Sequence, residues 1–195
     1  MTSMKAQLML REVLPFAFSL AALGALALLL DALLHVYDAV WIGRYLGIVG
    51  TLLIICSFWY SLRKRKMVNS GNLTKLMHLH ERMAWLGSLL VLVHAGIHFN
   101  SILGWLAVWA MLVNVVSGLT GKFLLESSRK RMVLSREKMK KQGLIAEKLE
   151  EQLYWDSLTF DVVKKWRVIH IPITLAFAVL AIGHIVSIFL FWGWK

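Results

Sequence analysis

The sequence has a single cysteine, Cys56, and so no second thiol with which it could pair within the chain. This scarcity excludes intramolecular disulfides, iron–sulfur clusters held by several cysteines, and covalent haem attachment through a CxxCH motif. The sequence also contains no internal repeat and no low-complexity tract. Any bound cofactor must therefore be held by side chains other than thiolates.

Acidic residues are also few, with 11 Asp and Glu against 22 Lys and Arg. In a soluble protein such an imbalance would suggest nucleic acid, but the distribution of the charges indicates something else. If the N-terminus is cytoplasmic, every Lys and Arg except Arg44 and Lys195 falls on the cytoplasmic side of the apolar segments. This is the positive-inside pattern, which predicts an N-in, C-out topology and no nucleic-acid partner. Anionic lipid headgroups would attract the same charges, so membrane lipid is an expected partner.

Long apolar runs are abundant, and 58% of the residues are hydrophobic. A bilayer core about 30 Å thick needs about 20 apolar residues per helix. This criterion predicts five transmembrane helices, at residues 14–35, 42–62, 79–99, 102–125 and 168–192. The expected fold is all-α, one five-helix membrane domain over residues 1–195. The first run exceeds the roughly 7–15 residues of a signal-peptide core, so we expect a retained helix.

The longest polar segment is the predicted cytoplasmic loop 126–167, which is dense in charge and in good helix formers. Its apolar residues recur every three to four positions, which predicts that part of the loop is an amphipathic helix. They include Leu144, Ile145, Leu149, Leu153 and Tyr154. Such a helix could lie on the lipid headgroups or dock a soluble partner subunit, and the two roles are compatible.

Six of the seven histidines lie in or beside the third and fifth predicted helices, where ionisable side chains are candidates for a functional site. His80 precedes His94 by fourteen positions, and His170 precedes His184 by the same interval. Over that interval an α-helix ends about 40° short of four full turns and rises about 21 Å. Each pair is therefore predicted to lie on one face of its helix, near opposite sides of the membrane.

Two parallel helices with paired histidines at two levels could clamp two planar macrocycles, which predicts two haem groups. His80 and His170 would be the axial ligands of the inner haem iron, and His94 and His184 those of the outer one. A metal-ion site needs three or four convergent ligands, which two imidazoles per level do not supply. Histidine on both sides of the iron predicts electron transfer rather than oxygen binding, and the lack of cysteine attachment predicts haem b.

The angular positions of the other two histidines on the third predicted helix indicate whether they can be haem ligands. His78 lies about 200° round the helix from His80 and is predicted to face away from the inner haem. His98 lies one turn beyond His94. If His98 were the ligand, the two ligands of the outer haem would differ in height by about 6 Å and the haem would be tilted, which favours His94. Midway between the ligands, Phe177 could pack between the haems into space left at Gly87. Alternatively, Gly87 simply permits close helix packing.

Three segments of the sequence resemble bacterial di-haem b-type membrane cytochromes of the ferric-reductase-like and cytochrome b561-like kind. They are "HLHERMAWLGSLLVLVHAGIHF", "VVSGLTGKFLLESSRKRM" and "WRVIHIPITLAFAVLAIGHIVSIF", and together they cover about residues 77–191. The resemblance implies that His80, His94, His170 and His184 are the axial ligands, and that Arg82 and Arg167 could meet haem propionates. Self-sufficient members continue into a flavin and nicotinamide domain, which these 195 residues do not contain.

The resemblance therefore implies the cytochrome b subunit of a larger respiratory-chain oxidoreductase in the bacterial cytoplasmic (inner) membrane. Its expected partners are soluble flavin, iron–sulfur or cytochrome c subunits, with quinone or another carrier on the opposite face. A haem-free membrane anchor and a histidine-based metal transporter are the alternatives.

Other polar residues lie in the predicted membrane helices. Asp31 and His35, one turn apart, could form with His98 an outer quinone or proton site, or could be an interfacial pair. A third haem held by His35 and His98 is a further alternative. Asn114 and Ser117 are predicted to make hydrogen bonds between helices.

Overall fold

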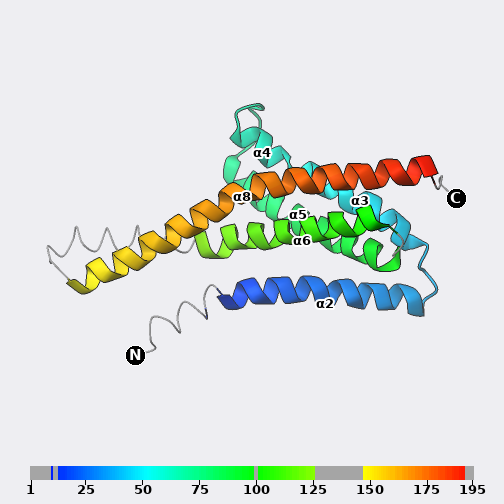
Figure 1. The fold of residues 1–195 in the computed structure, drawn as a ribbon, viewed down its shortest axis with the longest axis horizontal. Helices are drawn as coiled ribbons and strands as arrows, with labels where there is room; N and C mark the ends of the chain where they lie inside the picture. The colour runs from blue at the N-terminus through cyan, green and yellow to red at the C-terminus, as the bar shows by residue number, and fades with distance from the viewer. Residues whose placement is uncertain (1–9, 11–12, 99–100, 126–146, 192–195) are drawn as a thin grey trace. The chain divides into compact units, whose positions relative to one another are not determined.

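A computed structural model describes residues 10, 13–98, 101–125 and 147–191, with backbone only at 124–125, 147–164 and 166–167. The described residues form helices and their connections and contain no strand. The helices are α2 (Leu14–Val36), α3 (Ile42–Ser57), α4 (Trp59–Lys64), α5 (Leu73–Ile97), α6 (Ile102–Thr120), the π-helical turn η2 (Gly121–Leu125) and α8 (Glu147–Phe191) (Figure 1). The predicted all-α class is therefore confirmed for this part of the chain.

Within the described residues, four helical segments are long and apolar enough to cross a membrane. They are Leu14–Val36, Ile42–Lys64, Ile102–Phe123 and Val168–Phe191. These correspond to four of the five predicted spans and indicate a multi-pass membrane protein. The fifth predicted span falls on α5, a 25-residue helix that carries histidines and the charged pair Glu81 and Arg82, which lower its mean hydropathy. Its crossing of the membrane stays a prediction.

The polar segment before the last span differs from the prediction. We expected a separate loop over 126–167, but α8 begins at Glu147 and continues through Pro172 to Phe191 as one helix of 45 residues. Leu149, Leu153 and Tyr154 lie within this helix, whereas Leu144 and Ile145 lie outside the described residues. The expected helix is thus continuous with the last span, since neither glycine nor proline lies between Glu147 and Val168 to interrupt it.

The chain divides into two compact units. The larger unit comprises Leu20–Val115 and Ile173–Lys195, and the smaller comprises Met1–Ser19 and Val116–Pro172. The core of the larger unit is formed by Leu23 and Ala27 of α2 and by Leu89 and Val93 of α5. The two members of each pair lie one helical turn apart, so their side chains share one face of their helix.

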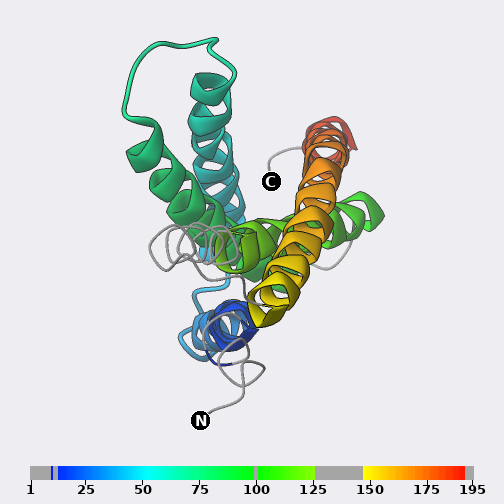
Figure 2. The same ribbon diagram turned by 90° about the vertical axis from the view of Figure 1, so that its left-hand side faces the viewer.

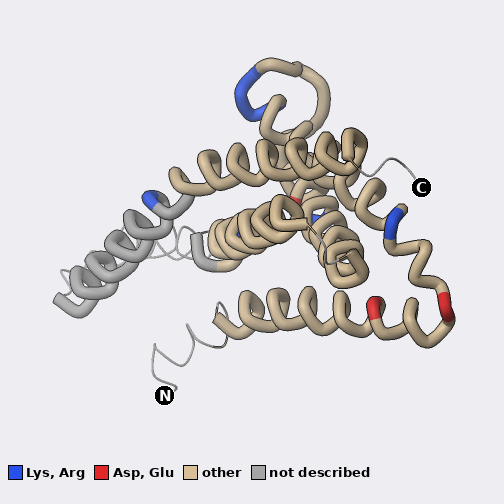
Figure 3. The backbone as a smooth tube through the Cα atoms, turned by 45° about the vertical axis from the view of Figure 1, so that its right-hand side comes forward, with Lys and Arg blue, Asp and Glu red and all other residues tan. Residues whose placement is uncertain are grey.

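Helices α3, α4 and α5 of the larger unit form a hairpin in which α3 and α5 lie side by side (Figure 2). Basic residues gather where α4 turns toward α5 (Figure 3), and the Arg63 side chain donates to the Gly71 carbonyl across this turn at 3.2 Å. Asn72 caps α5 by accepting hydrogen bonds from the backbone N–H groups of Thr74 and Lys75, at 2.9 and 3.4 Å. The helix therefore begins at Leu73, before the predicted residue 79.

Candidate functional site

The two predicted ligands on α5 each bond to the backbone of α3. The Nδ1 atom of His94 lies 2.9 Å from the carbonyl oxygen of Gly43, and that of His80 lies 3.0 Å from the carbonyl oxygen of Ser57. The interval from His80 to His94 on α5 equals the interval from Gly43 to Ser57 on α3, and the two run in opposite directions. The antiparallel helices therefore keep one register over about 21 Å.

Glycine lies at the midpoint of this register on both helices. A Cβ at Gly87 would lie 2.8 Å from the carbonyl oxygen of Gly50, and a Cβ at Gly50 would lie 2.8 Å from that of Gly87. On α3, Gly43, Gly50 and Ser57 are all buried and recur at every seventh position, so they share one face. Small residues let two membrane helices approach closely. This approach brings the carbonyl groups of α3 within reach of the imidazoles.

A carbonyl oxygen can only accept, so Nδ1 of His80 and of His94 must carry the hydrogen. In a neutral imidazole the other nitrogen, Nε2, then keeps a lone pair. Metal-bound histidines commonly donate their second N–H to a carbonyl or carboxylate, which fixes the tautomer and raises the basicity of the ligand. In both α5 histidines the lone pair of the neutral imidazole is therefore on Nε2, the atom that can act as a metal ligand.

The predicted ligands on α8 bond to serine hydroxyls instead. His184 Nδ1 lies 2.9 Å from Ser101 Oγ in the larger unit, and His170 Nδ1 lies 3.1 Å from Ser117 Oγ in the smaller unit. A hydroxyl can donate as well as accept, so it is compatible with either tautomer. In all four predicted ligands, Nδ1 thus makes a hydrogen bond within the protein.

The larger unit contains both members of the predicted outer pair. His80 belongs to the larger unit and His170 to the smaller one. The pairing of His80 with His170 therefore stays a prediction based on sequence spacing.

Glycine also makes room for the rings of the outer pair. A Cβ at Gly47 of α3 would lie 2.7 Å from Cγ of His94, and one at Gly104 of α6 would lie 3.3 Å from Nδ1 of His184. The sequence did not point to either glycine, to Ser101 or to the carbonyl partners, whereas Ser117 was predicted to bond between helices. The small residues repeated at every seventh position on α3 were the available signal, because they match the spacing of His80, Gly87 and His94.

We expect Gly47→Ala to disturb the outer ligand and leave the inner ligands in place. The added methyl group would press on the rigid ring of His94, whose hydrogen bond to Gly43 limits its movement. Any haem held by His94 should then be lost, as measured by the haem content of the purified variant. Gly24→Ala is the matched control, since a Cβ at Gly24 would meet nothing within 4 Å. Equal haem content in both variants would contradict this expectation.

The remaining histidines of α5 have other surroundings. His78 is exposed, and its Nδ1 lies 3.7 Å from the Glu81 carboxylate. His98 is exposed at the end of α5, and its ring stacks on that of His94 with centroids 5.0 Å apart and planes inclined by 25°. The ring of His80 stacks on Tyr60 at 5.6 Å.

Asp31 and His35 contact each other within α2, mainly through the backbone. The closer acceptor for His35 Nδ1 is the backbone carbonyl of Asp31 at 2.8 Å, whereas the nearest carboxylate oxygen lies at 3.8 Å. The carboxylate instead packs against α5, where a Cβ at Gly96 would lie 3.3 Å from Oδ1. This Oδ1 is buried and has no hydrogen-bond partner in the described part of the chain. The imidazole therefore bonds to the backbone of Asp31, and the carboxylate is its more distant neighbour.

The surroundings of Gly87 distinguish between the two roles predicted for it. The three atoms nearest to a Cβ at Gly87 all belong to Gly50 and Ile54 of α3, so the space that Phe177 was expected to enter is already filled by α3. Of the two alternatives, close helix packing is the one observed. The candidate propionate contact Arg82 is exposed, and the Arg167 side chain lies outside the described residues.

The two predicted polar contacts of α6 are confirmed. Asn114 Oδ1 accepts a hydrogen bond from the Thr174 hydroxyl of α8 at 2.9 Å, and Ser117 is the partner of His170. Over the residues that the structure describes, no three His, Cys, Asp or Glu side chains converge as a metal-ion site. No protein-family model, curated protein or solved structure matches the chain.

Proposed function

We propose that this protein is a membrane electron-transfer subunit that binds two haem b groups through His80/His170 and His94/His184. When bound, haem supplies reversible one-electron chemistry. One observation carries the proposal: His80 and His94, at equivalent positions four turns apart, both donate Nδ1–H to carbonyl groups of the same helix. Two isolated structural histidines would not need this repeated arrangement.

The surroundings of the outer pair suit a planar group that needs one imidazole from each side. Gly47 and Gly104 leave the two rings room, and Nε2 of His94 is left as a base by the bond at Nδ1. Two histidines are sufficient for such a group, since the macrocycle supplies the other four ligands of the iron.

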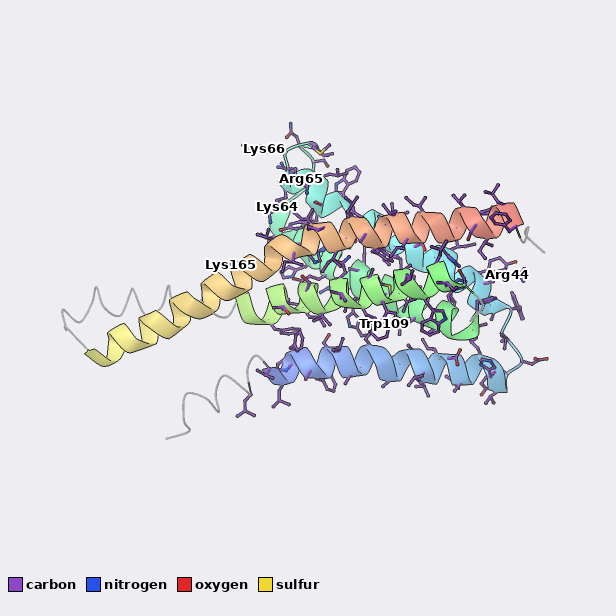
Figure 4. The ribbon with its side chains drawn as sticks, in the orientation of Figure 1. Arg44, Lys64, Arg65, Lys66, Trp109 and Lys165 are labelled. Atoms are coloured by element: carbon purple, nitrogen blue, oxygen red, sulfur yellow. The ribbon has the colours of Figure 1, made fainter. Side chains whose placement is uncertain are left out.

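The topology that we propose is N-in and C-out, with α5 as the fifth span. Arg44 lies where α3 begins, and Lys64, Arg65 and Lys66 lie at the far end of the same span, where α4 ends (Figure 4). The larger basic group then marks the cytoplasmic side. In the bacterial inner membrane this orientation would place His80 near the cytoplasm and His94 near the outer surface.

This arrangement would carry electrons between a soluble flavin, iron–sulfur or cytochrome c subunit and quinone or another carrier on the other face. Two haems at different depths shorten each electron-transfer step compared with a single central haem. Asp31 packs against Gly96 near the end of α5, where His98 caps the helix, and these two residues together with His35 are candidates for the quinone or proton site. Transfer across the membrane potential would involve about 2.3 kcal/mol per charge per 100 mV.

The visible spectrum of the purified protein tests this function. We expect the bands of reduced low-spin haem b at about two haems per chain, since each level offers two imidazoles and no open iron position. A colourless preparation would refute the proposal and favour a haem-free anchor. Zinc or another divalent metal bound in place of haem, measured by elemental analysis, would favour a transporter.

A further inference from the structure

The hydroxyl of Ser101 has two partners within the larger unit. It accepts a hydrogen bond from the backbone N–H of Gly104 at 3.1 Å, which makes Ser101 the N-cap of α6. The same oxygen lies 2.9 Å from Nδ1 of His184 on α8. Gly104 permits this contact, because a Cβ there would press on the imidazole at 3.3 Å. One side chain thus joins the start of α6 to a predicted ligand.

The hydrogen-bonding capacity of this hydroxyl determines which tautomer of His184 it can bind. A serine hydroxyl has one hydrogen to donate and two lone pairs that accept. The bond from Gly104 uses one lone pair, so the oxygen can either accept from Nδ1–H or donate to a bare Nδ1. If it donates, Nε2 must carry the hydrogen of the neutral imidazole and cannot bind a metal. If it accepts, Nε2 is free to act as a ligand.

His94 has no such choice, because its partner is a carbonyl group that can only accept. The two imidazoles of the outer pair therefore differ in how their tautomers are set. Binding at Nε2 of His184 would select the arrangement in which Nδ1–H donates to Ser101. That hydrogen bond would increase the electron donation from the imidazole to the iron, as hydrogen bonds to metal-bound histidines do.

We infer that Ser101 is a positioning residue for the outer site: its hydroxyl accepts the Nδ1–H of His184, fixes the orientation of that ring and lowers the reduction potential of the haem bound there. This inference rests on the proposed function. A more basic imidazole stabilises the oxidised iron, so loss of the hydrogen bond raises the midpoint potential. The inner site, whose α8 ligand bonds to Ser117, is unaffected by a change at Ser101.

The test is a redox titration of the purified Ser101→Gly variant, followed by its visible spectrum. Glycine is tolerated at an N-cap with a loss of only a few tenths of a kcal/mol. This variant therefore removes the hydroxyl and preserves the start of α6. We expect one of two Nernst components to move to higher potential while the other stays in place, together with about 10-fold weaker retention of one haem. Ser101→Asp keeps the cap and supplies a stronger acceptor, so it should move the same component to lower potential.

Ser187→Ala is the matched control. Ser187 also bonds to His184, but it donates to the backbone carbonyl at 2.8 Å and not to the ring, so neither component should move. Ser117→Ala should move the other component, since its hydroxyl bonds to His170. Two bound haems whose potentials do not change in Ser101→Gly overturn the inference and leave the proposed function standing. Equal movement of both components also overturns it, and a colourless wild-type protein overturns both.

Discussion

Replacing His184 with alanine is expected to remove one haem and leave the other, which halves the haem content of the purified protein. Alanine offers no atom to bind the iron, and His184 is the predicted ligand from α8 at the outer level. Because His80 and His170 are untouched, the spectrum of the remaining haem should keep its low-spin form. The haem-to-protein ratio and a redox titration with a single remaining component are the measurements.

His98→Ala is the control for this variant. The ring of His98 stacks on His94 at 5.0 Å, so its loss perturbs the surroundings of the outer site without removing a predicted ligand. We expect His98→Ala to keep both haems. Loss of neither haem in His184→Ala would refute the proposed pairing. Loss of a haem in His98→Ala would instead favour His98 as a ligand, with a tilted outer haem or a third haem shared with His35.

A leucine at Gly87 is expected to have a still broader effect, with loss of both haems and of stability. Its Cβ would lie 2.8 Å from the carbonyl oxygen of Gly50 and 2.8 Å from Cγ1 of Ile54, so α3 and α5 would have to separate. Overpacking of this kind usually costs about 1–3 kcal/mol, and here rigid backbone is the neighbour. Separation would also lengthen the bonds from His80 and His94 to the carbonyl groups of α3.

Thermal unfolding in detergent and haem content together check this expectation. Gly24→Leu is the matched control, because a Cβ at that position of α2 would meet nothing within 4 Å. The control should resemble the wild type in both measurements. If Gly87→Leu keeps its haem and its melting temperature, the close contact between α3 and α5 does not set the ligand geometry, and their shared register does not position the histidines.

The helical segments could be located from the sequence, because length and hydropathy are local properties of the chain. Four of the predicted spans have counterparts in the structure with ends that differ by a few residues. The exception is α8. The predicted loop ended at a change in polarity near Arg167, but no residue there ends the helix. A change in charge does not by itself end a helix, and neither glycine nor proline lies between Glu147 and Val168. Pro172 lies within the span, and the helix continues past it.

The candidate ligands could also be identified from the sequence, since the equal spacing of the two histidine pairs needs only the helical repeat. What holds these ligands could not be identified in this way. The acceptors for His80 and His94 are backbone carbonyl groups 23 and 51 residues away, and carbonyl groups are present at every position of every sequence. Only the antiparallel register of α3 and α5 selects Ser57 and Gly43 from among them.

The same distinction explains why the sequence left two roles open for Gly87. A glycine on a helix face indicates a close approach, but the sequence does not say which element approaches. In the folded chain that element is α3, because the buried small residues Gly43, Gly50 and Ser57 form a matching face. Helical periodicity therefore determined which residues share a face, and packing between helices decided which face each one meets.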